Sequence, residues 1–170
     1  TVALASTAGA TRISLSAPSS AIKRIRLRWR GRTAEASRIL GDTWERGYGD
    51  LEWRGIVPDR VMPWYVAVDT GTVTHAYGVR TGPRAFCFWQ IDANGITLVA
   101  DVRSGASGVT LKDRILDVCD VVTRAGRAGE TSFAAVHAFC RQMCANPRMP
   151  AAPIYGSNDW YWAYGKNSAT

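Results

Sequence analysis

The chain has 170 residues, 46% of them hydrophobic, which suffices for one domain of ordinary size with a buried core and does not favour two complete domains. No apolar run reaches the roughly eighteen residues needed to cross a membrane. The first residues lack both an initiator Met and the basic flank of a secretion signal, so we expect the native start to lie upstream. The formal net charge of +7 makes nucleic acid the first partner to consider.

The four cysteines stand in apolar or helical settings without the spacing of a disulfide framework. They favour reduced thiols and a cytoplasmic location, with secretion left open. Cys140 and Cys144 share one helical stripe with His137, but the chain has no Cys-x-x-Cys pair and the stripe lacks a fourth metal ligand. We therefore predict neither a metal nor a cofactor.

Short alternating runs separated by turn residues extend from the start of the chain to about residue 123, a rhythm typical of antiparallel sheets. Strands are predicted at residues 12–16, 23–32, 64–68, 72–80, 85–91, 96–103 and 114–122. Turns at residues 69–71 and 92–95 contain glycine and join two pairs of these strands as hairpins. The economical architecture is an antiparallel β-sandwich over residues 1–129. Residues 85–91 are apolar on both faces, as expected of a central strand covered on each side.

In the basic segment, arginines alternate with apolar residues at a period of two. One face of this extended strand carries Ile25, Leu27 and Trp29, and the other carries Arg24, Arg26, Arg28, Arg30 and Arg32. This is the pattern of a half-buried strand with a solvated basic face. No recognition helix, zinc finger or stacked-aromatic RNA motif accompanies it, so we predict no nucleic-acid partner. Binding of an anionic polymer by the basic face stays as a third hypothesis.

The loop at residues 40–54 combines glycines at 41, 47 and 49 with acidic and indole side chains. We expect a shaped loop here, because glycine lets the backbone turn tightly. Its acids and tryptophans are Asp42, Trp44, Glu45, Asp50, Glu52 and Trp53. Either these side chains project toward a ligand, or the acids only pair with Arg46, Arg54 or neighbouring arginines.

The pattern changes after residue 129. A capping signal at residues 130–132 precedes apolar residues at 133, 136, 139, 140, 143 and 144, which predicts one amphipathic helix. Prolines at 147, 150 and 153 then enforce an extended connection. Residues 130–152 are thus expected to link the sandwich to a separate unit at residues 153–170.

That last unit carries five aromatic residues at positions 155–164, around Asn158 and Asp159. Aromatic faces beside amide and carboxylate groups suit sugar rings, which offer an apolar C–H face and a rim of hydroxyls. The alternative is that these rings fill a core, which is the commoner fate of aromatic residues.

Several motifs together resemble melibiase-type proteins, the α-galactosidase-like glycoside hydrolases. The resemblance runs from about residue 12 to the end, through residues 40–46, 48–54, 78–82, 86–90, 139–141 and 155–161. Its most specific pieces are Tyr48-Gly49-Asp50-Leu51-Glu52-Trp53 and the segment Tyr155-Gly156-Ser157-Asn158-Asp159-Trp160.

The resemblance implies a β-sandwich domain (supersandwich-like) packed on a catalytic (β/α) barrel, with residues 153–170 as the barrel's first strand and loop. It implies retaining hydrolysis of an α-galactoside by two carboxylates about 5 Å apart, without a cofactor. Both carboxylates belong to later barrel strands in that family. We therefore assign no catalytic residue to this chain and expect it to be inactive alone.

Residues 156–160 resemble the family's Gly-Trp-Asn-Ser-Trp pattern, so Asn158 and Trp160 are candidate sugar-binding residues. Ser157 stands where the sugar-facing tryptophan is expected. Either Trp160 or Trp162 replaces that ring, or the sugar specificity differs. Asp159 either holds sugar hydroxyls or caps the following turn.

The sandwich itself would act as a scaffold and lend Asp42, Trp44, Glu45 or Asp50 to an active-site rim, in its own chain or in a neighbouring subunit of a homo-oligomer. The rival hypothesis is a stand-alone carbohydrate-binding or interaction module whose aromatic tail folds onto the sandwich. If the chain is a stand-alone module, its residues up to position 164 should be packed in the folded domain. If it is the N-terminal portion of a hydrolase, residues 153–170 should be exposed.

Overall fold

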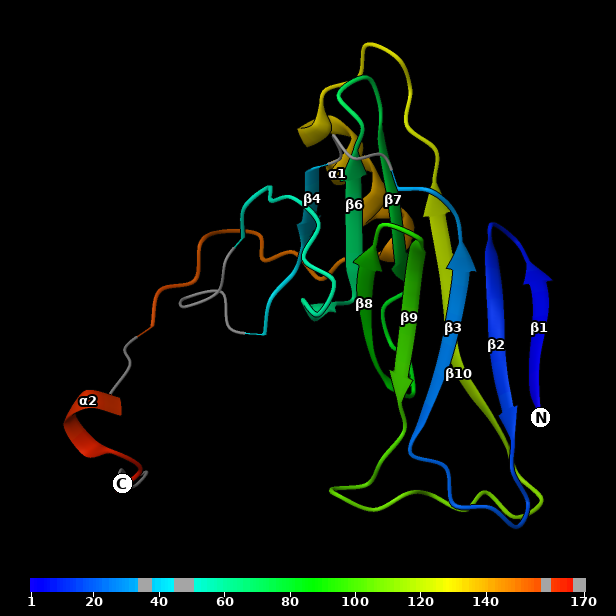
Figure 1. Ribbon diagram of the computed structural model, residues 1–170. Helices are drawn as coiled ribbons and strands as arrows, with labels where there is room; N and C mark the ends of the chain where they lie inside the picture. The colour runs from blue at the N-terminus through cyan, green and yellow to red at the C-terminus, as the bar shows by residue number, and fades with distance from the viewer. Residues whose placement is uncertain (34–37, 45–50, 157–159, 167–170) are drawn as a thin grey trace.

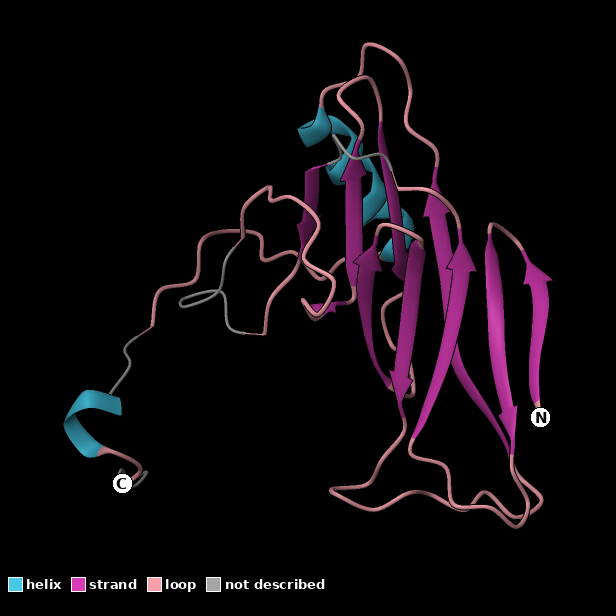
Figure 2. Ribbon diagram, viewed as in Figure 1, coloured by secondary structure: helices cyan, strands magenta, loops and turns pink. Residues whose placement is uncertain are grey.

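The computed structural model describes residues 1–170 except 34–37, 45–50, 157–159 and 167–170 (Figure 1). The described part is mainly β, with ten strands in two antiparallel sheets and two helices after them (Figure 2). The larger sheet holds, in spatial order, β1 (Val2–Thr7), β2 (Ala10–Ser16), β10 (Ile115–Arg124), β7 (Thr74–Val79), β6 (Tyr65–Asp69) and β4 (Arg38–Gly41). The smaller sheet holds β3 (Arg24–Arg30), β9 (Gly95–Asp101), β8 (Phe86–Asp92) and β5 (Met62–Pro63).

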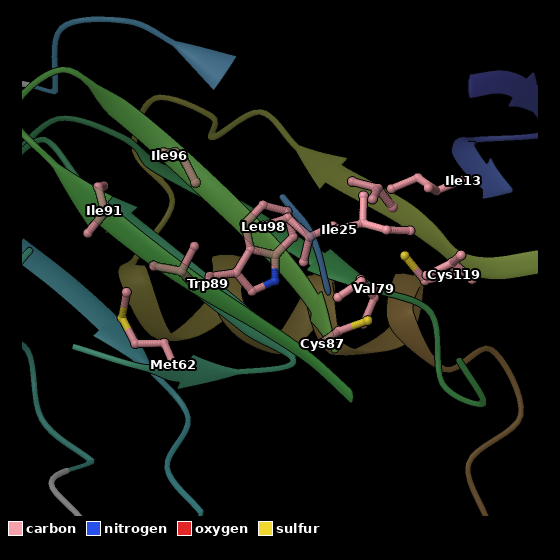
Figure 3. Packing of buried hydrophobic residues seen from close by; sticks show 14 of the residues in the cluster. Ile13, Ile25, Met62, Val79, Cys87, Trp89, Ile91, Ile96, Leu98 and Cys119 are labelled. Carbon is pink, nitrogen blue, oxygen red and sulfur yellow. The ribbon is translucent and has the colours of Figure 1, made fainter. Parts of the chain in front are cut away.

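The main hydrophobic core lies between the two sheets (Figure 3). Strand β8 shows how alternation builds it: Cys87, Trp89 and Ile91 are at most 1% exposed, while the residues between them are half-buried on the outer face. The larger sheet contributes Ile13 and Val79 to the same cluster. The antiparallel, mainly β architecture predicted from the sequence is therefore confirmed.

Trp64 is the point where the chain passes from one sheet to the other. Its φ of 67° is unusual for a residue with a side chain. Its backbone N–H donates to the Cys87 carbonyl of β8, and its own carbonyl accepts from Val79 of β7. One residue thus hydrogen-bonds to both sheets.

Helix α1 (Ser132–Met143) covers the outer face of the larger sheet. It begins where predicted, because the Thr131 side chain accepts a hydrogen bond from the Ala134 N–H. Phe139 is fully buried in a second, smaller cluster that includes Ala76 of β7 and Val122 of β10. Gly78 of β7 leaves room for the helix, since a Cβ there would lie 2.7 Å from Met143 Sδ and 2.9 Å from Phe139 Cε1.

The seven strands expected from alternation appear within three residues of their predicted bounds, whereas β1, β4 and β5 were not predicted. The expected connection after α1 has neither helix nor strand at residues 145–156. Beyond it lies α2 (Trp160–Ala163), so the described part of 153–170 contains a short helix and no strand. A barrel strand takes its hydrogen bonds from neighbouring strands, and no described strand pairs with this segment. Within the described residues, no helix is both long and apolar enough to pass through a membrane.

Candidate functional site

Four aromatic side chains form what we call the aromatic ledge: Trp44, Trp64, Phe86 and Phe88. Trp44 stacks on Phe86, with ring centroids 4.2 Å apart and planes at 23°. Trp64 meets the same phenyl ring edge-on at 5.2 Å, and Phe88 lies 6.1 Å from it. Trp44 is 61% exposed, so the ledge presents an indole ring to solvent.

The ledge follows from local sequence. Phe86 and Phe88 alternate with the buried Cys87 and Trp89, so their rings stand on the outer face of the smaller sheet. Trp64 reaches the ring of Phe86 from the crossing point between the sheets, and Trp44 comes from the loop after β4. The sequence predicted Trp44 as a ligand-facing residue but missed its three partners. Their signal was present in the apolar outer face of residues 85–91, a pattern that is also typical of a strand covered on both faces.

The outer face of the same sheet also carries the predicted basic stripe of β3. Arg24 pairs with Asp101 at 2.9 Å, and Arg28 binds Asp92 through two N–H donors at 2.7 and 2.8 Å. The hydrogen bonds from Arg28 and from the Asn94 backbone lower the pKa of the Asp92 carboxyl. Half of the stripe's four strand arginines are thus already paired with acids. This weakens the case for an anionic polymer as the partner of the stripe.

Asp42 does not join the ledge. It is only 4% exposed and accepts a hydrogen bond from the N–H of Thr43 at 2.9 Å, so its carboxylate lies inside the loop. Glu52 pairs with Arg54 at 2.6 Å, as the structural alternative for this loop expected. The predicted site residues Glu45 and Asp50 lie outside the described residues.

The terminal aromatic segment stands apart from the ledge. Tyr155 is 90% exposed, Trp162 is 91% exposed and Trp160 is 56% exposed. Trp160 contacts the ring of Tyr164 within its own segment, at 5.9 Å, and α2 lies away from both sheets (Figure 1). The structure therefore does not bring Trp160 and Trp162 together with Trp44. Asn158 and Asp159 lie outside the described residues.

The cysteine and histidine stripe of α1 forms no metal centre in the described structure. His137 stacks against Phe133 with centroids 6.0 Å apart. Among the described residues, no group of three or more His, Cys, Asp or Glu side chains is placed to hold a metal ion.

Comparison with protein-family models found no match, and neither did comparison with curated proteins or with solved structures. The functional argument therefore depends on the geometry and chemistry of the chain itself.

Proposed function

We propose that this chain is the N-terminal portion of an α-galactosidase-like glycoside hydrolase, which acts in carbohydrate metabolism by retaining hydrolysis of α-galactosides in its full-length form. The observation that carries the proposal is the exposure of the terminal aromatic segment. Ile154, Tyr155 and Trp162 are each more than four-fifths exposed. Large apolar side chains gathered in one exposed segment mark a surface that another structure covers.

In this proposal the covering structure is the catalytic barrel, to which residues 153–170 contribute the first strand and loop. The barrel's remaining strands supply inter-strand hydrogen-bond partners for the segment, and they also carry the nucleophile and the acid. The chain alone is inactive, because it supplies neither carboxylate. Its own contribution to substrate binding comes from Trp160 and Trp162, with Asn158 and Asp159 beside them.

The aromatic ledge gives the sandwich a role beyond that of a scaffold. The free face of Trp44, held flat by its stack on Phe86, suits the apolar C–H face of a pyranose ring. Because the stack fixes the indole before the sugar arrives, little side-chain entropy is lost on binding. The ledge then acts as an outer subsite for an α-galactoside, in the same chain or in a neighbouring subunit.

The test combines the intact mass of the source polypeptide with hydrolysis of 4-nitrophenyl α-galactoside by that polypeptide and by residues 1–170. We expect cleavage only by a source polypeptide heavier than the 18.5 kDa of this chain. A heavier polypeptide that does not cleave the substrate contradicts the proposal, and so does cleavage by residues 1–170 alone.

A second candidate, a stand-alone carbohydrate-binding module, is favoured by one observation: the ledge is complete without any barrel residue. The hydrolysis assay above separates the two candidates, and titration of melibiose into residues 1–170 and their Trp44→Ala variant tests the ledge that both use. Both roles of the ledge predict saturable binding that Trp44→Ala weakens about tenfold, as expected for loss of one aromatic platform. Phe133→Ala is the matched control, because Phe133 is an exposed ring on α1 away from the ledge. Absence of binding by residues 1–170 would contradict both the module and the role of the ledge as an outer subsite of the hydrolase.

A further inference from the structure

The smaller sheet ends at β3, and one edge of this strand pairs with no other strand in the described part of the chain (Figure 1). We propose that this edge binds an extended, acidic peptide segment of a partner protein, which adds to the smaller sheet as an antiparallel strand. Addition of a strand to an exposed sheet edge is a recurring mode of peptide recognition. The inference stands apart from the proposed hydrolase, because it uses neither the ledge nor the terminal aromatic segment.

The backbone of β3 has hydrogen-bonding groups available on this edge. Just past the strand, the Gly31 N–H donates to the Asn94 carbonyl on the side of β9, so the odd-numbered residues are those that bond to β9. Just before the strand, Ile22 exchanges two hydrogen bonds of 2.9 Å with Val109 on the opposite side. The even-numbered residues therefore direct their N–H and C=O groups to the free edge, and within β3 these are the arginines at 24, 26, 28 and 30.

The space beside this edge is open at both ends of β3. At one end, a cavity of about 450 Å³ is lined by Val2 and Leu15 of the larger sheet and by Ile25 of β3. At the other end, a cavity of about 410 Å³ is lined by Thr11 of β2 and Trp29 of β3. Each cavity has β3 on one side and the hairpin of β1 and β2 on the other. An added strand would lie between these two walls.

The larger sheet leaves apolar side chains exposed beside the free edge. Val2 and Leu4 of β1 lie directly opposite Leu15 and Ile13 of β2, which belong to the main core, so both residues stand on the core-facing side of the sheet. They are nevertheless 41% and 58% exposed, because no described strand of the smaller sheet extends past β3 to cover them. A strand added to β3 would place every second side chain on this inward side. These inward positions should be apolar, since they would remove Val2 and Leu4 from water.

Arginine sets the charge of the outward side. Arg24 and Arg28 are bound to acids of their own sheet, whereas Arg26 and Arg30 form no ion pair with any residue that the structure describes. A residue directly opposite an arginine on the added strand shares its face, and opposite charges in such pairs are favourable. The outward positions of the partner segment should therefore be acidic. A second copy of β3 is a poor partner, because arginines would then lie opposite arginines.

The experiment is an anisotropy titration of residues 1–170 against a fluorescein-labelled peptide, Glu-Val-Glu-Ile-Glu-Val-Glu, whose length matches the seven residues of β3. We expect saturable binding of one peptide per chain. Two control peptides should each bind at least about tenfold more weakly. One has the same composition without alternation, Glu-Glu-Val-Ile-Val-Glu-Glu, and the other keeps the alternation with Lys in place of each Glu.

Methylation of the peptide's backbone nitrogens tests pairing at the edge directly. In the antiparallel arrangement, the glutamates opposite the arginines exchange hydrogen bonds with β3, and the N–H groups of the valines point away from it. N-methylation of the two central glutamates should therefore abolish binding, whereas N-methylation of the two valines should leave it largely intact.

A double variant locates the site on β3. Arg26→Gln with Arg30→Gln should weaken binding about three- to tenfold, because it removes two exposed ion pairs of modest strength. The matched control is Arg127→Gln with Arg148→Gln, which removes the same charge at two exposed arginines that line neither cavity. Thermal unfolding of both double variants checks that weaker binding reflects the edge and not the fold.

Five results would overturn the proposal. Three concern the peptides: no saturable binding, equal affinity for the peptide without alternation, or equal affinity after N-methylation of the central glutamates. Binding unchanged by Arg26→Gln with Arg30→Gln would place the peptide on another edge. A dimer of residues 1–170 in sedimentation that the peptide dissociates would identify a second copy of the chain as the occupant.

Discussion

A single carboxylate, that of Asp69, ties together three segments of the molecule. It is 4% exposed and forms an ion pair with Arg38 of β4. It also accepts from the N–H of Gly71 at 3.0 Å and from the Ser132 hydroxyl at 3.2 Å, at the start of α1. Burial alone would raise the pKa of Asp69, but the hydrogen bonds from Gly71, Arg38 and Ser132 outweigh it and lower the pKa.

This lowered pKa predicts a pH-dependent contribution to stability. The folded-state pKa lies below the unfolded value of about 3.9, so the contribution is complete above that value and is lost as the pH falls through the folded pKa. We expect Asp69→Asn to reduce the free energy of unfolding by about 1–3 kcal/mol at pH 7. The difference from the parent should shrink below about pH 4.

Urea unfolding of the parent and of Asp69→Asn from pH 7 to pH 3 measures this difference. The control is Asp113→Asn, at an exposed aspartate of the connection before β10. A difference between Asp69→Asn and the parent that stays constant down to pH 3 would show that ionisation of Asp69 is not its source.

The candidate site shows what residue patterns alone can and cannot predict. Trp44 was a candidate to project from the loop toward a ligand, and it is exposed. Asp42, two residues away, was expected beside it but is buried. Whether a loop carboxylate turns inward depends on which backbone N–H groups the fold brings to it, and that is not a local property.

At the scale of elements, local signals predicted most of the structure. The alternation of side chains predicted β3 and β8, and the capping residue Thr131 predicted the start of α1. These predictions succeeded because each signal lies within the element itself. Strand β5 has only two residues, too few to show a period, and β1 is exposed along almost its whole length. Pairings such as β3 with β9 join residues far apart in the chain, and no local pattern specifies them.

The packing of α1 on β7 predicts a strict size limit at position 78. We expect Gly78→Ala to lower the free energy of unfolding by about 1–3 kcal/mol, because its methyl group would overlap Met143 and the fully buried Phe139. Combining it with Met143→Ala should recover part of that loss, since the two sites share one contact.

Urea unfolding of the two single variants and the double variant measures this coupling. Gly55→Ala is the control, because a Cβ there meets no atom within 4 Å. If Gly78→Ala and the parent had equal free energies of unfolding, α1 would be able to move away from the larger sheet without loss of stability.

At the scale of the whole molecule, the sheets and α1 form one packed body, and the terminal aromatic segment does not share its core. The two core clusters draw on strands of both sheets and on α1, and neither includes a residue beyond Met143. The two core clusters therefore take no residue from the described part of 153–170.

This division predicts the effect of removing residues 153–170. The free energy of unfolding should change by less than about 0.5 kcal/mol, because surface segments that bury little contribute little. Self-association should fall, since Tyr155 and Trp162 are among the most exposed apolar side chains described. Urea unfolding and sedimentation of residues 1–170 and 1–152 measure the two effects separately.

A loss of stability above 1 kcal/mol would mean that the segment packs on the sheets in solution, as the stand-alone module requires. Unchanged stability with weaker self-association would instead identify the segment as a surface that another structure covers, which is the role the hydrolase proposal gives it.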